Sequence, residues 1–137
     1  MNNLSDKIFE FGFHDSEISA INCKDTSVYL HFNKGLYLLD STGKETELSK
    51  PVVMKIDIDP RYIYDSLEDF IEIKEFNNQE QYIDFLSFQK SISDLSFGIH
   101  MVYYSRFSNI ILFDGGNRDK HIMFTVENCI DVVYQYI

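Results

Sequence analysis

The segment formed by residues 11–18 (Phe-Gly-Phe-His-Asp-Ser-Glu-Ile) holds the densest group of side chains that could do chemistry. His14, Asp15 and Ser16 are the residue types of a hydrolytic triad, but they are consecutive in the chain. Because consecutive side chains of an extended segment point to opposite faces, these three residues cannot line up as orienting acid, base and nucleophile. We therefore expect Asp15 or Ser16 to cap backbone N–H groups where a loop enters a strand.

The same segment supplies part of a metal-ligand set. His14, Asp15 and Glu17 form an alternative candidate site, but a transition metal needs three or more converging ligands, so a remote histidine would have to join them. The remaining histidines occupy expected strand positions and are His31, His100 and His121. We interpret each as a hydrogen-bonded strand residue, while strand order decides whether any of them converges with His14. The sequence thus predicts no metal site and no cofactor.

Three further patterns resemble known motifs but are incomplete. The pair Gly43-Lys44 lacks the upstream glycine of a phosphate-binding loop, and glutamate follows it. Residues 114–117 (Asp-Gly-Gly-Asn) lack the regularly spaced carboxylates of a calcium loop, so both patterns are interpreted as turns. Asp57 and Asp59 share one face of an expected strand and could form an acid–base pair, but we interpret them as solvated.

Acidic residues are concentrated in the middle of the chain. The net charge is −10, and residues 57–84 hold nine carboxylates against only Arg61 and Lys74. This segment forms either a solvated face or a surface that docks to a basic partner, since complementary charge accelerates and orients encounter. The candidate contact residues on such a surface are Asp65, Glu68, Asp69, Glu72 and Glu75.

Composition narrows the class of protein. The chain of 137 residues suits a single domain, residues 1–137, with 45% apolar and 15% aromatic residues to fill a core. It has no cluster of Lys and Arg, which argues against nucleic acid and anionic membranes as partners. The start of the chain shows no secretory signal and no apolar run has membrane-spanning length, so we expect a cytoplasmic protein with reduced Cys23 and Cys129.

Apolar and polar side chains alternate with a period of two along much of the sequence, which predicts mainly β-strands. The clearest half-buried strand is residues 52–59, where one face holds four apolar side chains and the other holds Val53, Lys55, Asp57 and Asp59. Other strands are expected at residues 16–23, 28–32, 36–40, 70–76, 98–105, 109–114 and 120–126. The turn at residues 33–35 predicts a hairpin between residues 28–32 and 36–40, and residues 114–117 predict a second one.

Helices are few. Asn78 could cap a helix that runs to about Ser91, and Asp59-Pro60 could start a short helix. Residues 128–137 show helical spacing but are rich in β-branched side chains, so both helix and strand stay open. We expect an α+β fold, mainly antiparallel β, arranged as a meander-rich sheet or a partly closed sandwich or barrel with one or two helices late in the chain.

Residues 13–21 (Phe-His-Asp-Ser-Glu-Ile-Ser-Ala-Ile), followed by the expected strand at residues 28–32, resemble the opening of several small uncharacterised bacterial domain families. These families carry a Phe/Trp-x-His-Asp-(Ala/Ser) motif near the N-terminus, and some of them resemble immunity proteins of bacterial toxin systems. The resemblance implies a small β-rich bacterial domain and favours a protein-binding role. It carries over no catalytic residue.

Three functional hypotheses follow. The leading one is a non-catalytic protein-interaction domain, conceived as an immunity-type protein that neutralises a basic toxin enzyme. The second is a small-molecule-binding or metal-dependent enzyme that uses His14, Asp15 and a remote histidine. The third is a homo-oligomeric structural component that associates through an exposed strand edge or a face rich in its nine tyrosines.

Overall fold

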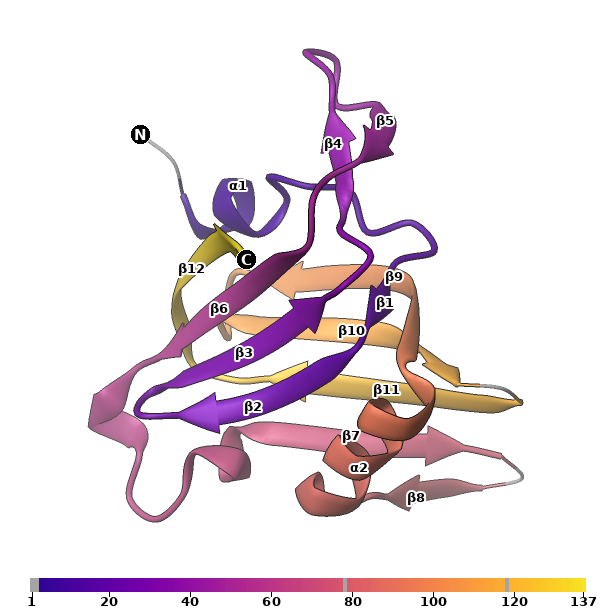
Figure 1. Ribbon diagram of the computed structural model, residues 1–137. Helices are drawn as coiled ribbons and strands as arrows, with labels where there is room; N and C mark the ends of the chain where they lie inside the picture. The colour runs from indigo at the N-terminus through magenta and orange to yellow at the C-terminus, as the bar shows by residue number, and fades with distance from the viewer. Residues whose placement is uncertain (1–2, 78, 118) are drawn as a thin grey trace.

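Two antiparallel sheets face each other in the computed structural model of the chain, which describes residues 3–77, 79–117 and 119–137 (Figure 1). The larger sheet has six strands in the order β1-β9-β10-β11-β7-β8. Its strands are β1 (Glu17–Ile18), β9 (Phe97–Ser105), β10 (Ile110–Asn117), β11 (Lys120–Val126), β7 (Ile71–Phe76) and β8 (Glu80–Tyr82).

The second sheet has four strands in the order β12-β6-β3-β2. They are β12 (Cys129–Tyr136), β6 (Val52–Ile58), β3 (Ser27–Phe32) and β2 (Ala20–Lys24). A separate hairpin consists of β4 (Tyr37–Leu39) and β5 (Glu45–Leu48). The helices are α1 (Leu4–Ile8) and α2 (Phe85–Leu95), with 3₁₀ turns η1 (Pro60–Tyr62) and η2 (Leu67–Phe70).

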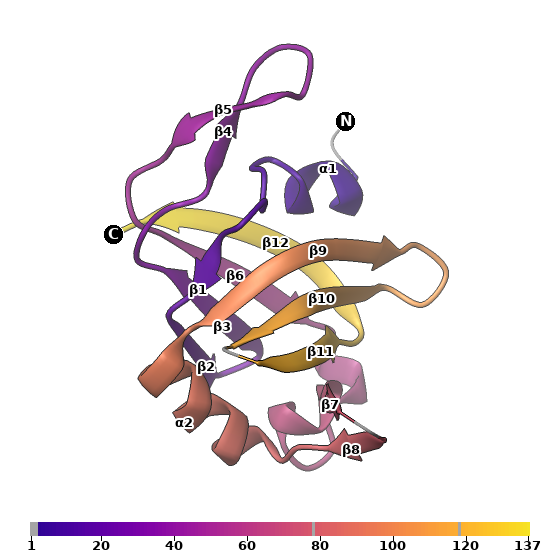
Figure 2. The same cartoon turned by 90° about the vertical axis from the view of Figure 1, so that its right-hand side faces the viewer.

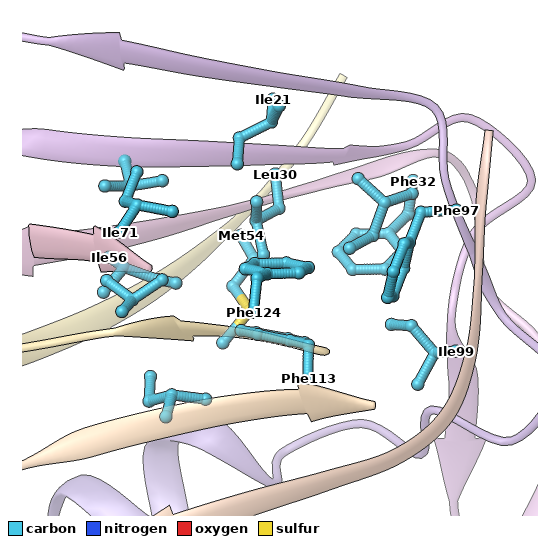
Figure 3. Close-up of a cluster of buried hydrophobic side chains, with 14 of the residues drawn as sticks. Ile21, Leu30, Phe32, Met54, Ile56, Ile71, Phe97, Ile99, Phe113 and Phe124 are labelled. Carbon is cyan, nitrogen blue, oxygen red and sulfur yellow. The ribbon is translucent and has the colours of Figure 1, made fainter. Parts of the chain in front are cut away.

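The hydrophobic core lies between the two sheets. Figure 3 shows Leu30 and Met54 of the four-stranded sheet on the side of the core opposite Phe113 and Phe124 of the larger sheet. Phe113 and Phe124 are register partners on β10 and β11, and their rings stack with centroids 4.7 Å apart. Such stacking adds to the hydrophobic gain from burying both rings.

Helix α2 covers one open side of the sandwich (Figure 2). It buries Phe88 and Ile92, and the Phe88 ring packs against Phe124 with centroids 5.1 Å apart. The Gln89 side chain donates a hydrogen bond of 2.9 Å from Nε2 to the carbonyl of Ile21 on β2. The helix therefore joins the edge strand of one sheet to the core side of the other.

The expected fold class is confirmed: the chain is α+β and mainly antiparallel β, with a helix late in the sequence. The strand predicted at residues 52–59 is β6, which ends at Ile58, and the short helix predicted from Asp59-Pro60 is η1. No helix of the described residues has the length and apolar character needed to cross a membrane.

The hairpin predicted between residues 109–114 and 120–126 is confirmed, because β10 pairs antiparallel with β11, but residues 114–117 are not its turn. These residues belong to β10, which pairs with β11 through Asn117. The register with β9 shifts between Asp114 and Gly115, which marks a β-bulge. A Cβ at Gly115 would lie 1.9 Å from the carbonyl oxygen of Gly98, so the glycine serves a close approach of two strands and not a turn.

The hairpin predicted between residues 28–32 and 36–40 is wrong. Strand β3 pairs with β2 and β6, whereas β4 pairs with β5. Gly35, with φ +80°, donates its N–H to the Phe32 carbonyl, and this turn directs the chain out of the sheet.

The predicted helix from Asn78 begins later than expected. Asn78 itself lies outside the described residues, but Glu80–Tyr82 form β8 against β7, so the helix starts only after Asp84. Asp84 caps it by accepting a hydrogen bond of 2.8 Å from the Ser87 N–H. The ambiguous C-terminal segment is strand β12, which pairs with β6 along its length.

Candidate functional site

Part of the acidic middle segment folds around one groove of about 360 Å³. Its carboxylates come from three places: Glu68 and Asp69 on η2, Glu72 on β7, and Asp84 at the start of α2. We call this site the acidic groove, and its remaining lining consists of Ile71, Ile73, Tyr82, Ile83 and Phe85. Carboxylates thus share the groove with apolar and aromatic side chains.

The groove forms because short elements turn the chain back on itself. After η2 the chain enters β7, and β8 returns antiparallel to it, with Lys74 opposite Tyr82. The Ile83 N–H donates to the Ile73 carbonyl at 2.9 Å, which extends the pairing and carries Asp84 back toward η2. Residues far apart on an extended chain therefore line the same acidic groove.

One cation lies beside the acidic groove. The Lys74 ammonium contacts Glu72 at 3.3 Å and Glu80 at 2.6 Å, and it lies over the Tyr82 ring at 5.1 Å from the centroid. Hydrogen bonds to Glu80 and Glu72 raise the pKa of Lys74. Because Lys74 is shared between two carboxylates, the groove keeps an excess of negative charge.

The negative charge of the acidic groove contributes to the raised pKa values of two neighbouring groups. Burial raises the pKa of Glu127, and the charge of Glu72 raises it further. Burial likewise raises the pKa of the Cys23 thiol to about 12, with a further contribution from the Glu68 carboxylate. Hydrogen bonds from Ser87 instead lower the pKa of Asp84, which keeps this capping carboxylate ionised.

Three of the five predicted contact residues line the acidic groove, and two lie outside its lining. Glu68, Asp69 and Glu72 line it, whereas Asp65 lies exposed in the loop between η1 and η2. Glu75 alternates to the other face of β7, where Lys120 contacts it at 3.6 Å and its side chain is only 16% exposed. Sequence reasoning did not select Asp84, although its capping signal was available in the Asp84-x-x-Ser87 spacing.

The alternative site around His14 lies in another part of the molecule. His14 Nε2 is 3.1 Å from Asp15 Oδ2, and both side chains are largely exposed. The Glu17 carboxylate forms an ion pair with the Lys34 ammonium, with Oε2 and Nζ 2.6 Å apart. Ser16 is buried, and its hydroxyl lacks a hydrogen-bond partner among the described residues, so the expected cap by Ser16 is not formed.

The four histidines do not converge on one point. His14 and His100 line the same hollow, whereas His31 bonds Asn22 and His121 pairs with Asp114. Within residues 3–77, 79–117 and 119–137, no group of three or more His, Cys, Asp or Glu side chains is placed to hold a metal ion.

Asp57 and Asp59 do not form the pair of carboxylates on one strand face that the sequence indicated. Asp57 accepts a hydrogen bond from the Ser27 hydroxyl. Asp59 lies beyond the end of β6, is only 7% exposed, and caps η1 by accepting from the backbone and side chain of Arg61. Both carboxylates are occupied by structural hydrogen bonds.

Comparison with known proteins adds no relative. No family model, no curated protein and no solved structure matches the chain.

Proposed function

We propose that this chain is a non-catalytic protein-interaction domain that binds a basic partner through the acidic groove. The observation that carries the proposal is the convergence of Glu68, Asp69, Glu72 and Asp84 on one groove with an apolar and aromatic lining. A solvated face explains scattered carboxylates, but it does not require them to gather around one groove beside an exposed aromatic side chain, Tyr82.

Such a groove suits lysine and arginine side chains of a partner. Their charged ends can pair with carboxylates, and arginine can do so with two parallel hydrogen bonds. Their aliphatic stems can pack on the apolar lining, where Tyr82 is 70% exposed. Tyrosine is enriched in protein interfaces, so Tyr82 is a fitting anchor beside the acidic groove.

The surface around the groove can widen the contact. A stable protein interface covers about 800 Å² on each partner, which is more than one groove supplies. Exposed Asp65 and Glu80 belong to the loop before η2 and to β8, the elements that flank the groove lining in the chain. They would extend the negative field that guides a basic partner toward the site.

The resemblance of the N-terminal segment to immunity-like families supports a specific form of this proposal. In that form the partner is a basic toxin enzyme, and the domain neutralises it by covering its positively charged surface. The net charge of −10 on the whole chain also favours a positively charged partner.

Affinity capture from the native lysate tests the proposal. The bait is the tagged protein at low salt, and the parallel bait carries Glu68→Lys, Asp69→Lys and Glu72→Lys. We expect a stoichiometric basic protein on the first bait, released by salt because exposed charge pairs are screened, and its absence from the second. An empty capture, or equal capture by both baits, would contradict the proposal.

The enzyme hypothesis stays a prediction. His14 and Asp15 pair with each other, and His14 shares a hollow with His100, which gives this hypothesis a pocket, although no group of three or more His, Cys, Asp or Glu side chains in the described residues is placed to hold a metal ion. The homo-oligomer hypothesis also stays a prediction, and light scattering of the concentrated protein would test it.

A further inference from the structure

A second hollow of about 360 Å³ lies where the β4–β5 hairpin meets the sandwich. Figures 1 and 2 both show this hairpin at the same end of the molecule as α1. The hollow is lined by side chains of the segment after α1, of the hairpin and of β9, including Phe9, Phe11, Phe13, His14, Glu45 and His100. It shares no lining residue with the acidic groove.

Backbone hydrogen bonds fix the walls of this hollow. Gly12 and Tyr37 form a β-bridge, with the Gly12 N–H donating to Tyr37 at 2.8 Å and the Tyr37 N–H donating back at 3.1 Å. At the base of the hairpin the Ser49 N–H donates to the Leu36 carbonyl at 2.7 Å. The hairpin is therefore held against the segment after α1, and the hollow has a formed shape.

Glu45 contributes a carboxylate that the protein leaves without a partner. Its Oε2 is buried and accepts no hydrogen bond from any donor in the described residues. Glu45 also belongs to none of the ion pairs in that part of the chain, whereas Glu17 on the neighbouring β1 is paired with Lys34. A carboxylate oxygen that is buried without a donor or a cation costs free energy in the folded state, so a cation that reaches the half-buried Glu45 side chain would be stabilising.

We propose that this hollow binds a small organic amine, whose ammonium group pairs with Glu45 and whose apolar body packs on the phenylalanines. The volume of the hollow is within the range of small-ligand sites, about 300–1,000 Å³. A cation is the partner that a lone carboxylate selects, and aromatic rings attract cations as well as apolar groups. The imidazoles of His14 and His100 offer hydrogen bonds to polar substituents of the ligand.

This inference does not depend on the proposed function. Protein binding is assigned to η2, β7, β8 and the start of α2, whereas amine binding is assigned to the segment after α1, the β4–β5 hairpin and β9. Either assignment can fail without the other.

Titration of the ¹⁵N-labelled protein with benzylammonium, followed by NMR, tests the inference. We expect saturable shifts at the amides of Gly12, Glu45 and His100. Benzyl alcohol, which has the same ring without the charge, should bind about tenfold more weakly or worse, because its hydroxyl can donate a hydrogen bond to the carboxylate but cannot form an ion pair with it. This comparison uses the unaltered protein and needs no variant.

Glu45→Gln provides the second arm, with Glu47→Gln on the same strand as the matched control. Glu47 is exposed and does not line the hollow, so Glu47→Gln should bind benzylammonium as the original protein does. Glu45→Gln should weaken binding about tenfold or more and, without ligand, should unfold at a higher temperature, because it removes the charge from a side chain with one buried, unpaired oxygen.

Three outcomes would overturn the inference. They are the absence of saturable shifts at the hollow, equal binding of benzyl alcohol, and unchanged binding by a folded Glu45→Gln variant. Tighter binding of Nα-acetyl-lysine amide than of benzylammonium would also overturn it, since the ligand would then be a lysine side chain of another protein and not a small amine.

Discussion

The carboxylate of Glu45 packs directly against the backbone of Gly12. A Cβ on Gly12 would lie 2.5 Å from Glu45 Cγ and 2.7 Å from Glu45 Oε2, so only glycine leaves room for the carboxylate in its present place. The two residues are brought together by the β-bridge between Gly12 and Tyr37, since Tyr37 and Glu45 belong to the two strands of one hairpin. Gly12 therefore determines where the charge of the hollow lies.

Gly12→Ala should displace the Glu45 side chain and impair amine binding. The new methyl group meets atoms of the flexible Glu45 side chain, which can move away. The free energy of unfolding should therefore fall by about 1 kcal/mol. Benzylammonium titration and urea unfolding measure the two effects. Unchanged binding in a folded variant would show that the position of Glu45 does not matter to the ligand.

Gly115→Ala should be far more damaging than Gly98→Ala. A methyl group at Gly115 would meet the backbone carbonyl oxygen of Gly98 at 1.9 Å, whereas one at Gly98 meets only an ordinary contact at 3.5 Å. We expect a loss of about 3 kcal/mol for Gly115→Ala and a change within about 1 kcal/mol for Gly98→Ala. Urea unfolding of the two variants checks this, and equal losses would contradict the bulge geometry.

The protein should lose stability in alkali through its buried thiols. Burial raises the pKa of Cys129 from 9.0 to about 12. Because the folded-state pKa is raised, the stabilisation is fully present below pH 9 and is lost as pH rises from there toward 12.

Cys129→Ala should remove its share of this alkaline loss. Between about pH 8 and about pH 10 the unfolded chain gains about 1.4 kcal/mol from ionising this thiol, and the variant should lack that part. Urea unfolding at both pH values gives the difference. An identical pH dependence in the two proteins would show that the Cys129 thiol ionises as readily in the folded state.

Glu72→Gln should lower the pKa of Glu127. Burial is the larger cause of the raised pKa of Glu127, and the charge of Glu72 is the second, so the pKa should fall but stay above its ordinary value. Glu80→Gln is the matched control, because Glu80 also pairs with Lys74 but does not act on Glu127. NMR titration of the Glu127 carboxyl carbon measures both, and equal shifts would contradict the proposed crowding of charge at the acidic groove.

The sequence was informative where one local pattern had one physical outcome. Residues 54–58 alternate apolar and charged side chains within β6, and the apolar ones lie in the core. Residues 129–136, which include the β-branched Ile130, Val132 and Val133, form a strand because β6 offers them an edge to pair with, and no local pattern expresses that circumstance. The overall antiparallel class followed from the number of such alternating runs.

The turns were less predictable, because glycine has more than one use. The Asp-Gly-Gly-Asn segment looks like a hairpin turn, but its first glycine is required by the close approach of β9 and β10. Gly35 does make a turn, yet it leads out of the sheet and not into a neighbouring strand. Distinguishing these uses requires knowledge of which strands are adjacent.

The candidate sites were predictable only in part. The excess of carboxylates between residues 57 and 84 is plain in the sequence, but the separation of Glu75 from Glu72 depends on strand order, which places Lys120 of β11 beside Glu75. The hollow at Glu45 gave no signal, because Gly12 and Glu45 are joined only by the bridge to the hairpin.

The most direct test of the account is the dissociation constant of the captured basic partner for two charge-matched variants. The first carries Glu68→Lys, Asp69→Lys and Glu72→Lys in the acidic groove, and the second carries Glu10→Lys, Glu47→Lys and Asp94→Lys at exposed positions outside it. Both change the net charge equally. The account predicts that the first variant loses binding at least about tenfold more than the second. Equal losses would mean that only overall charge matters, and would contradict the assignment of the partner to the acidic groove.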